Sequence, residues 1–326
     1  MQPIGLNPYG LAYALGLQGA NTPRANPNPI SLTDYINIAK SIGAGGIELH
    51  AEHLFPLTDQ QLTAIRSEFD ALGWWVVLAR PLMIDAWDQT VRVAQFLKAK
   101  TIRMHCTSIL CGDRVANGCD WAVLVKDVRE KLAAASKATS PHGLRLAIED
   151  HQDFGSAELL ELCGSCGENI GIALDTANPL SVAEDPLDFA RAVAPKVFHV
   201  HLKDYRAHWS DEGYRLIRCA TGDGCIPFQE ICAHFAGRDR VTAAIEIGSL
   251  NARHIRVFDP NYWSHHPPCD VRQFSKAMAA ARVNRFREEE DWRTPWEKEA
   301  SAEEIVAYEI DQVKKSVENL RRLSLM

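Results

Sequence analysis

Short apolar segments alternate with longer segments of helical periodicity along most of this chain. Eight of the short segments are rich in β-branched or aromatic residues or are bounded by turn residues, which is typical of buried strands. These expected strands span residues 9–16, 46–50, 74–80, 101–106, 145–150, 170–176, 197–204 and 243–248. Two helices are expected to begin after the capping residues Ser31 and Thr58. Six more are expected over residues 86–99, 121–137, 156–163, 186–193, 227–236 and 302–323.

The strict alternation of strands and helices predicts a parallel sheet with right-handed crossovers. Eight such units without a second regime of composition predict an α/β fold in which residues 1–326 form one closed (β/α)8 barrel. The alternative is a doubly wound open sheet, which usually carries a glycine-rich phosphate turn that this sequence lacks. Two connections are long: residues 205–221, and residues 251–301 between the eighth strand and the last helix. Both follow strands, so we expect them at the rim where barrel enzymes hold their active sites.

Composition narrows the functional classes. Hydrophobic residues make up 46% of the chain and charged residues 24%, which is ordinary for a globular protein. The formal net charge of −7 argues against a general nucleic-acid binder, which needs a basic surface. The sequence shows neither the roughly 18 apolar residues of a membrane span nor a signal peptide, so we expect a cytoplasmic protein with reduced cysteines. Cys163 and Cys166 have the spacing of redox and zinc motifs but stand alone, and we interpret them as incidental thiols.

Ionisable residues recur at the ends of the last four expected strands. Glu149, Asp175 and His201 follow one another at intervals of 26 residues, and Glu246 comes 45 residues later, after the long seventh connection. Period-2 alternation places these side chains on the same strand faces as small alanines, so they point into the barrel. Three converging carboxylates and an imidazole repel or desolvate one another unless a cation lies between them. The donor set suits Mn, Mg or Co, and also Zn or Fe; the alternative is a set of unrelated salt bridges to helix residues.

A cation at this place would polarise a substrate carbonyl as a Lewis acid, so that the neighbouring C–H becomes acidic and an enolate or enediolate can form. Glu149 and Glu246 are the expected acid and base, because they come from different strands and can flank a substrate. The alternative is that both serve only as metal ligands. His151 and Lys203 are further catalytic candidates, with a hydrogen-bonded rim histidine and a solvated lysine as the plain alternatives. The same chemistry serves an isomerase, an epimerase or a lyase.

Other polar residues near the strand ends are candidates for contacting the substrate. Glu48 could bind a hydroxyl or form a salt bridge inside the barrel, and His199 is expected one layer deeper than His201. Arg218 could reach the substrate from the rim or remain solvated. The full set of substrate-binding candidates is Glu48, His50, His105, Asn178, His199 and Arg218. No basic cluster is visible along the rim, which argues against recognition of a phosphate.

Five motifs together resemble one family. Ile-Glu-Asp-His (148–151), Leu-Asp-Thr-Ala-Asn (174–178), His-Val-His-Leu-Lys-Asp (199–204), Gly-Asp-Gly (222–224) and Ala-Ile-Glu-Ile-Gly (244–248) are similar to those of the xylose isomerase-like TIM barrel superfamily. Within it, they resemble the sugar phosphate isomerase/epimerase group over residues 9–250 and the final helix. Together with the rim, which lacks a basic cluster, this resemblance favours an unphosphorylated sugar or a keto-glycoside as the substrate. The resemblance implies a TIM barrel with one divalent metal, often manganese. It also implies that Glu149, Asp175, His201 and Glu246 bind this metal, with the two glutamates carrying protons as well.

One position departs from many relatives, which have histidine where this chain has Asn178. The zinc-dependent AP endonucleases of the superfamily need that histidine and another just before the Gly-x-Gly turn, near the place of Arg218. We therefore do not expect a trinuclear zinc nuclease, in agreement with the acidic net charge.

The segment 251–301 is too long and too aromatic for a solvated loop. It resembles, more loosely, the extended eighth loop of the larger subunit of C-glycoside deglycosidases, which pair with a small second subunit. A lyase on 3-keto sugars, either such a deglycosidase or an inosose-type dehydratase, is therefore the alternative to a sugar isomerase or epimerase. An alternative of another class is a metal-free sugar-binding or scaffold subunit. We expect a homo-oligomer, with room for a small second subunit.

Overall fold

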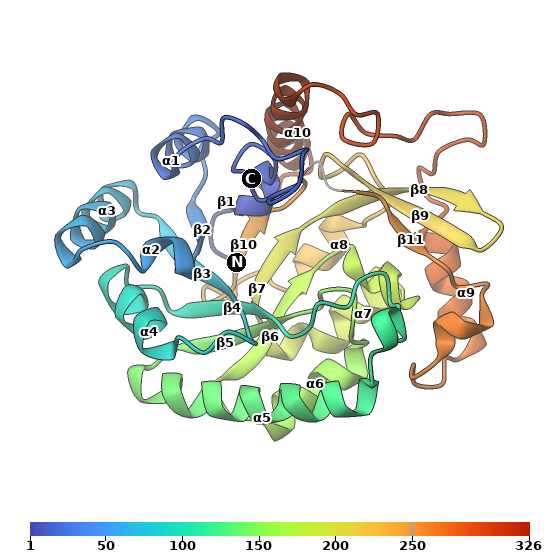
Figure 1. Cartoon of the computed structure of the whole chain (residues 1–326), viewed down its shortest axis with the longest axis horizontal. Helices are drawn as coiled ribbons and strands as arrows, with labels where there is room; N and C mark the ends of the chain where they lie inside the picture. Colours follow the sequence, from blue (N-terminus) through green and yellow to red (C-terminus); the bar gives the residue numbers. More distant parts are fainter. Residues whose placement is uncertain (249–250) are drawn as a thin grey trace.

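The computed structural model describes residues 1–248 and 251–326, apart from the side chain of residue 117, and it shows a closed parallel barrel (Figure 1). Around the barrel the strands follow the order β1-β10-β7-β6-β5-β4-β3-β2, so each is hydrogen-bonded to two parallel neighbours. The eight strands are β1 (Gly5–Leu6), β2 (Gly46–His50), β3 (Trp75–Pro81), β4 (Thr101–His105), β5 (Arg145–Glu149), β6 (Ile170–Asp175), β7 (Val197–Leu202) and β10 (Thr242–Ile245). The predicted (β/α)8 fold is confirmed.

Helices surround the barrel (Figure 1). They are α1 (Leu32–Ser41), α2 (Ala51–Leu54), α3 (Asp59–Leu72), α4 (Trp87–Phe96), α5 (Trp121–Thr139), α6 (Ser156–Ser165), α7 (Pro186–Val193), α8 (Phe228–Ala233), α9 (Val271–Ala280) and α10 (Ala302–Arg322). Ser31 and Thr58 form the capping boxes expected before α1 and α3, with Asp34 and Gln61 as reciprocal partners. The local start signals are therefore strong enough to fix these helix ends.

The first strand lies upstream of the segment predicted for it. The strand is Gly5–Leu6, and Pro8–Leu11 forms a 3₁₀ helix instead of the strand expected over residues 9–16. Asn7 caps this turn, since its Oδ1 accepts a hydrogen bond of 2.7 Å from the Tyr9 amide, and Pro8 suits a first helical position because it has no N–H to leave unpaired. The apolar pattern of residues 9–16 reflects burial in a turn, not a strand.

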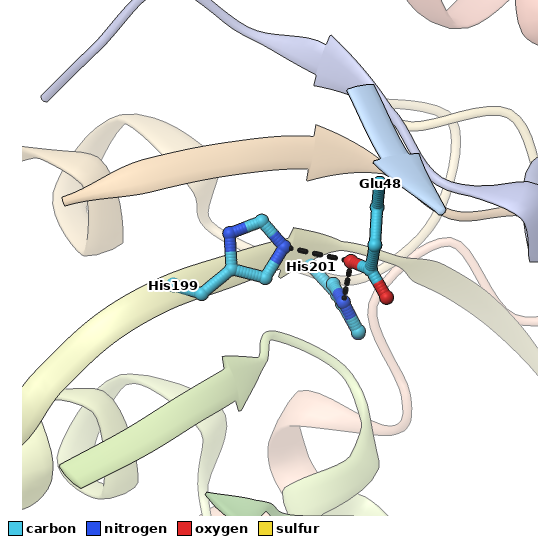
Figure 2. A group of neighbouring side chains, drawn as sticks. All are labelled: Glu48, His199 and His201. Carbon is cyan, nitrogen blue, oxygen red and sulfur yellow. Dashed lines mark hydrogen bonds and ion pairs between the residues drawn. The ribbon is translucent and has the colours of Figure 1, made fainter. Parts of the chain in front are cut away.

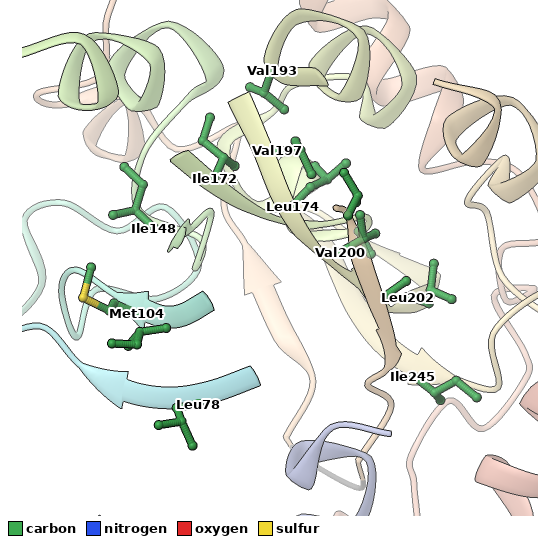
Figure 3. Packing of buried hydrophobic residues seen from close by; sticks show 14 of the residues in the cluster. Leu78, Met104, Ile148, Ile172, Leu174, Val193, Val197, Val200, Leu202 and Ile245 are labelled. Atoms are coloured by element: carbon green, nitrogen blue, oxygen red, sulfur yellow. The ribbon is translucent and has the colours of Figure 1, made fainter. Parts of the chain in front are cut away.

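The outward faces of the strands form the main hydrophobic core, as the alternation predicted. Ile148, Ile172 and Leu174 pack in one cluster with Val193 of α7 (Figure 3). Three alanines on the opposite faces are fully buried but lie outside this cluster: Ala147, Ala173 and Ala244. The interior of the barrel is thus left to small and polar side chains.

A second, three-stranded antiparallel sheet stands at the rim of the barrel. Its strands are β8 (Asp204–Ser210), β9 (Gly213–Cys219) and β11 (Arg253–Ile255), in the order β11-β9-β8 (Figure 1). The two long connections that the sequence places at the rim therefore pair with each other, and residues 251–301 continue through a 3₁₀ helix (Pro260–Trp263) into α9. We call β8, β9 and β11 the rim sheet.

Two further observations concern the described residues as a whole. No helix there is long and apolar enough to cross a membrane. All nine cysteines are free, and Cys163 and Cys166 lie buried near the end of α6, where burial raises the pKa of the Cys163 thiol to about 12. A thiol held so firmly protonated is a poor nucleophile, in keeping with its interpretation as incidental.

Candidate metal centre

Four buried side chains converge at the carboxyl ends of neighbouring strands. Glu149 ends β5, Asp175 ends β6, His201 lies near the end of β7 and Glu246 directly follows β10. One ligand atom from each lies within 4.8 Å of the others. The structure thus brings together the four residues that the sequence predicts as metal ligands, and it does so by the strand-end geometry from which they were predicted.

The His201 imidazole is held from both sides. Its Nδ1 lies 2.8 Å from Glu246 Oε2 and 3.3 Å from Glu149 Oε1, as ion pairs without hydrogen-bond alignment. Its Nε2 lies 2.9 Å from Glu48 Oε2, an oxygen that is also 2.9 Å from His199 Nε2 (Figure 2). Burial disfavours the imidazolium, but Glu246 and Glu48 outweigh this and raise the pKa of His201 well above its usual value.

Glu48 and His199 are candidates for substrate contact in the sequence, but the structure places them beneath the site. Both are fully buried. Both oxygens of Glu48 have partners, and the second ring nitrogen of His199 lies 2.7 Å from Thr242 Oγ1. Every polar side-chain atom of the two residues thus already has a partner within the protein. Their contacts instead orient His201, which is the usual role of carboxylates behind metal-bound histidines.

Arg103 is a central residue that the sequence interpretation missed. It lies on β4, and its guanidinium pairs with Glu48 Oε1 at 2.7 Å and with Glu149 Oε2 at 3.1 Å. Burial raises the pKa of Glu149, but Arg103, His151 and His201 together outweigh this and hold the pKa well below its usual value. The signal was present, because Thr101, Arg103 and His105 alternate with the outward-facing Ile102 and Met104.

Lys203 reaches into the same cluster from the residue after β7. Its ammonium forms ion pairs with Asp175 Oδ2 and, at 2.6 Å, with Glu246 Oε1. Burial raises the pKa of Asp175 to about 6 although Lys203 lowers it, and the pKa of Glu246 stays well below its usual value because Lys203 and His201 outweigh its burial. Asn178 Nδ2 donates a hydrogen bond of 2.8 Å to Asp175 Oδ2.

Three predicted histidines and one unpredicted tyrosine lie close to the cluster. The rings of His105 and His151 are 5.1 Å apart, and those of His50 and Tyr9 are 5.6 Å apart. Burial lowers the pKa of both His50 and His151 to about 3, so both rings are neutral near pH 7. His151 Nδ1 has no hydrogen-bond partner among the described residues. Tyr9 was missed because its segment was interpreted as a strand. Burial raises the pKa of its hydroxyl, and the nearby charges of Glu246 and Glu149 raise it further.

The donor set fits a divalent cation. Metal–oxygen and metal–nitrogen bonds are about 2.2 Å long, so opposite ligands lie about 4.4 Å apart, close to the 4.8 Å limit found here. His201 Nδ1 faces two carboxylates and makes no aligned hydrogen bond, as expected of a ligand nitrogen. Three carboxylates with one imidazole suit Mg, Mn or Zn.

Comparison with known proteins defines the family. The family described as xylose isomerase-like TIM barrel matches residues 36–249, and the chain belongs to this family. The uncharacterized protein YihM of Escherichia coli K12 is 29% identical over 108 residues, which is 33% of this chain and 33% of YihM. The matched region thus spans only a third of that relative.

Solved structures share the same fold. The probable 3-DHS dehydratase AsbF from Bacillus anthracis has a TM-score of 0.58 at 17% identity, over 74% of this chain and 92% of AsbF. A xylose isomerase-like TIM barrel protein from Mycobacterium smegmatis in complex with magnesium has a TM-score of 0.57 at 13% identity, over 86% of this chain and 98% of that one. D-psicose 3-epimerase, solved in the presence of D-fructose, has a TM-score of 0.53 at 19% identity, over 78% and 91%.

Proposed function

We propose that this protein is a divalent-metal-dependent enzyme that removes a proton next to the carbonyl of a sugar or related polyol, as an isomerase or epimerase. The observation that carries the proposal is the buried convergence of Glu149, Asp175, His201 and Glu246 within 4.8 Å at the strand ends. Membership of a family whose fold neighbours include epimerases and a dehydratase supports an enzyme of this kind.

These four side chains would hold the ion, which would polarise the substrate carbonyl and stabilise the negative charge that develops on its oxygen. Glu149 and Glu246 lie on separate strands, and each has one oxygen on His201 and the other on a fixed cation, Arg103 or Lys203. Both are carboxylates at neutral pH and can accept a proton at an oxygen. Because the two come from different sides of the barrel, one can take a proton and the other can return one to the opposite face.

His151 and Lys203 have supporting roles in this proposal. His151 is a neutral imidazole with a free Nδ1 among the described residues, so it can accept a proton or a hydroxyl hydrogen bond. Lys203 keeps its proton, because Asp175 and Glu246 raise its pKa against the effect of burial, and can stabilise an enediolate oxygen. His50, beside Tyr9, and His105, beside His151, are the proposed contacts to substrate hydroxyls.

The metal itself is proposed at the level of a hard divalent ion. Manganese follows from the family resemblance, and a fold neighbour was solved with magnesium. Elemental analysis of the protein after growth with Mn, Mg, Co or Zn would identify the ion. We expect one equivalent, removed by EDTA and lost in His201→Asn but retained in His142→Asn, whose imidazole is exposed.

Incorporation of solvent deuterium tests the reaction. The metal-loaded protein is incubated in D₂O with a panel of ketoses, aldoses and 3-keto glycosides, and products are followed by NMR. Exchange at a carbon next to the carbonyl, abolished by EDTA and restored by the metal, is the expected result. A protein without stoichiometric metal, or with exchange that EDTA does not affect, would contradict the proposal and favour a metal-free binding subunit.

The lyase alternative is separated by the same assay. The enolate that exchanges its proton can instead expel a substituent, so release of water or an aglycone would make the protein a dehydratase or deglycosidase. The probable dehydratase among the fold neighbours supports this alternative. A homo-oligomer and a small second subunit remain predictions, for which the mass of the purified assembly is the test.

A further inference from the structure

The rim sheet turns two arginines toward the barrel mouth. In its register Tyr205 of β8 lies opposite Arg218 of β9, and Leu216 of β9 lies opposite Arg253 of β11. Alternate residues of a strand share a face, so Arg218, Leu216 and their partners Tyr205 and Arg253 all lie on one side of the sheet. The other side carries Arg206, whose guanidinium stacks 3.9 Å from the Phe286 ring. The sheet therefore presents two guanidiniums together on its inner face.

Both guanidiniums contain buried nitrogens without a partner. Arg218 is only 6% exposed, and its Nε and Nη1 make no hydrogen bond within the described part of the chain. Arg253 Nε is buried in the same unpaired state. Buried polar groups are normally paired, and a buried charge without a counter-ion is costly. Two such groups side by side therefore call for an anion.

These arginines lie at the proposed active site. Tyr205, which shares their face, donates a hydrogen bond of 3.3 Å to Asn178, and Asn178 donates to the ligand carboxylate of Asp175. The charge of Arg218 partly offsets the raised pKa values of Tyr9 and Lys203, so it lies near both residues. Arg253 interacts electrostatically with Arg218 and with Tyr9. A substrate held at the metal centre would thus extend toward the two guanidiniums.

The charge balance of the centre, which rests on the function proposed above, points the same way. Four buried acids pair with Arg103, His201 or Lys203, and as carboxylates they carry four negative charges: Glu48, Glu149, Asp175 and Glu246. Arg103, Lys203 and one divalent cation offset these charges completely. Arg218 and Arg253 have no counter-charge in this balance, and a substrate that brings an anion would supply it.

We propose that Arg218 and Arg253 form an oxyanion subsite for the substrate, so that the enzyme acts on a sugar acid or a sugar phosphate. The fork of a guanidinium matches the two oxygens of a carboxylate or phosphate. This revises the neutral sugar favoured by the sequence, in which no basic cluster was visible. The two arginines are 35 residues apart and meet only because β11 pairs with β9.

Ligand binding without turnover tests the subsite. Calorimetric titrations would compare three unreactive polyols that differ in charge: sorbitol, D-gluconate and sorbitol 6-phosphate. Each is added to the metal-loaded and to the EDTA-treated protein. We expect at least one of the two anionic polyols to bind at least tenfold more tightly than sorbitol in both forms, and the tighter anion identifies carboxylate or phosphate. Arg218→Gln and Arg253→Gln should each remove at least tenfold of this preference.

Arg215→Gln is the matched control, because Arg215 lies on β9 but faces the outer side, near the Trp292 ring. It should keep the preference of the wild type. Equal binding of neutral and anionic polyols, or an equal loss in Arg215→Gln, would overturn the proposal. If circular dichroism shows that Arg218→Gln does not fold, Arg253→Gln decides. The EDTA-treated protein separates the two proposals. Loss of the anion preference in both forms would reject the subsite without affecting the metal centre, and failure to bind a metal would reject the metal centre without affecting the anion preference of the metal-free protein.

Discussion

Replacing Glu48 by glutamine tests the orientation of the proposed ligand His201. The Glu48 carboxylate accepts hydrogen bonds from Arg103 Nε at 2.9 Å and lies 2.9 Å from both His199 Nε2 and His201 Nε2. A glutamine has a single oxygen, and the Arg103 guanidinium, which only donates, will hold that oxygen. The amide nitrogen then faces the two imidazoles, which therefore must present unprotonated Nε2 atoms.

To bind a metal, His201 must be a neutral imidazole with an unprotonated Nδ1, the nitrogen that faces Glu149 and Glu246. The glutamine instead favours the neutral tautomer that carries its proton on Nδ1. Asn7 Nδ2, 3.0 Å from His201 Nε2, reinforces the change because it donates as well. Loss of the partner behind a metal-bound histidine typically costs 10- to 100-fold in metal affinity, which is about 1.4 to 2.7 kcal/mol. The weakened Arg103 contact adds roughly 3 kcal/mol of lost folding stability, at the low end for a broken buried pair.

Both quantities can be measured separately. Competition with a chelator of known affinity gives the metal dissociation constant, and urea unfolding of the EDTA-treated protein gives the stability. Glu230→Gln, an exposed position on α8, controls for the loss of one negative charge. Wild-type metal affinity in Glu48→Gln, together with reduced stability, would refute the reasoning, because the carboxylate would then serve the fold and not the ligand.

Three further predictions concern Lys203, the rim and the bottom of the barrel. Lys203→Met should bind the metal about tenfold more tightly, because the ammonium no longer competes for the carboxylates of Asp175 and Glu246. The variant should nevertheless lose deuterium exchange. An unchanged metal affinity in chelator competition would contradict this prediction. Burial lowers the pKa of His266 to about 4, so the folded state binds fewer protons than the unfolded state between pH 6.5 and 4, and stability falls as pH falls through this range. His266→Gln should remove roughly 2 kcal/mol of that loss in unfolding titrations, whereas an unchanged pH slope would exclude His266 as its source. Gly46→Ala would place its Cβ 2.1 Å from the Trp75 ring and should cost about 3 kcal/mol, so a wild-type Tm would show that the ring can move.

The strand-end residues were predictable because two local rules combine in a parallel barrel. Alternation decides which side chains point inward, and the regular βα unit puts successive strand ends at the same rim. Glu149, Asp175 and His201 recur at one-unit intervals, and the structure places them next to one another. No partner from elsewhere in the chain had to be known.

Arg103 shows where these rules stop. Its inward direction follows from the alternation on β4, but its partners Glu48 and Glu149 lie 55 and 46 residues away. The sequence contains many acidic residues that could pair with such an arginine. Only the closed barrel brings two of them, Glu48 and Glu149, within reach. The prediction of the first strand over residues 9–16 was wrong for a local reason. Asn7 and Pro8 favour a capped turn there, although the apolar pattern indicated a strand.

The departure at Asn178 acquires a physical meaning in the structure. Its amide nitrogen donates to Asp175 Oδ2, and its oxygen accepts from Tyr205 and Gln152, both at 3.3 Å. An amide N–H cannot coordinate a metal, and it occupies one of the two oxygens that Asp175 could share between ions. A histidine here would offer a ligand nitrogen in place of that donor. The asparagine therefore favours a single ion, and through Tyr205 it ties the ligand carboxylate to the rim sheet that carries the two arginines.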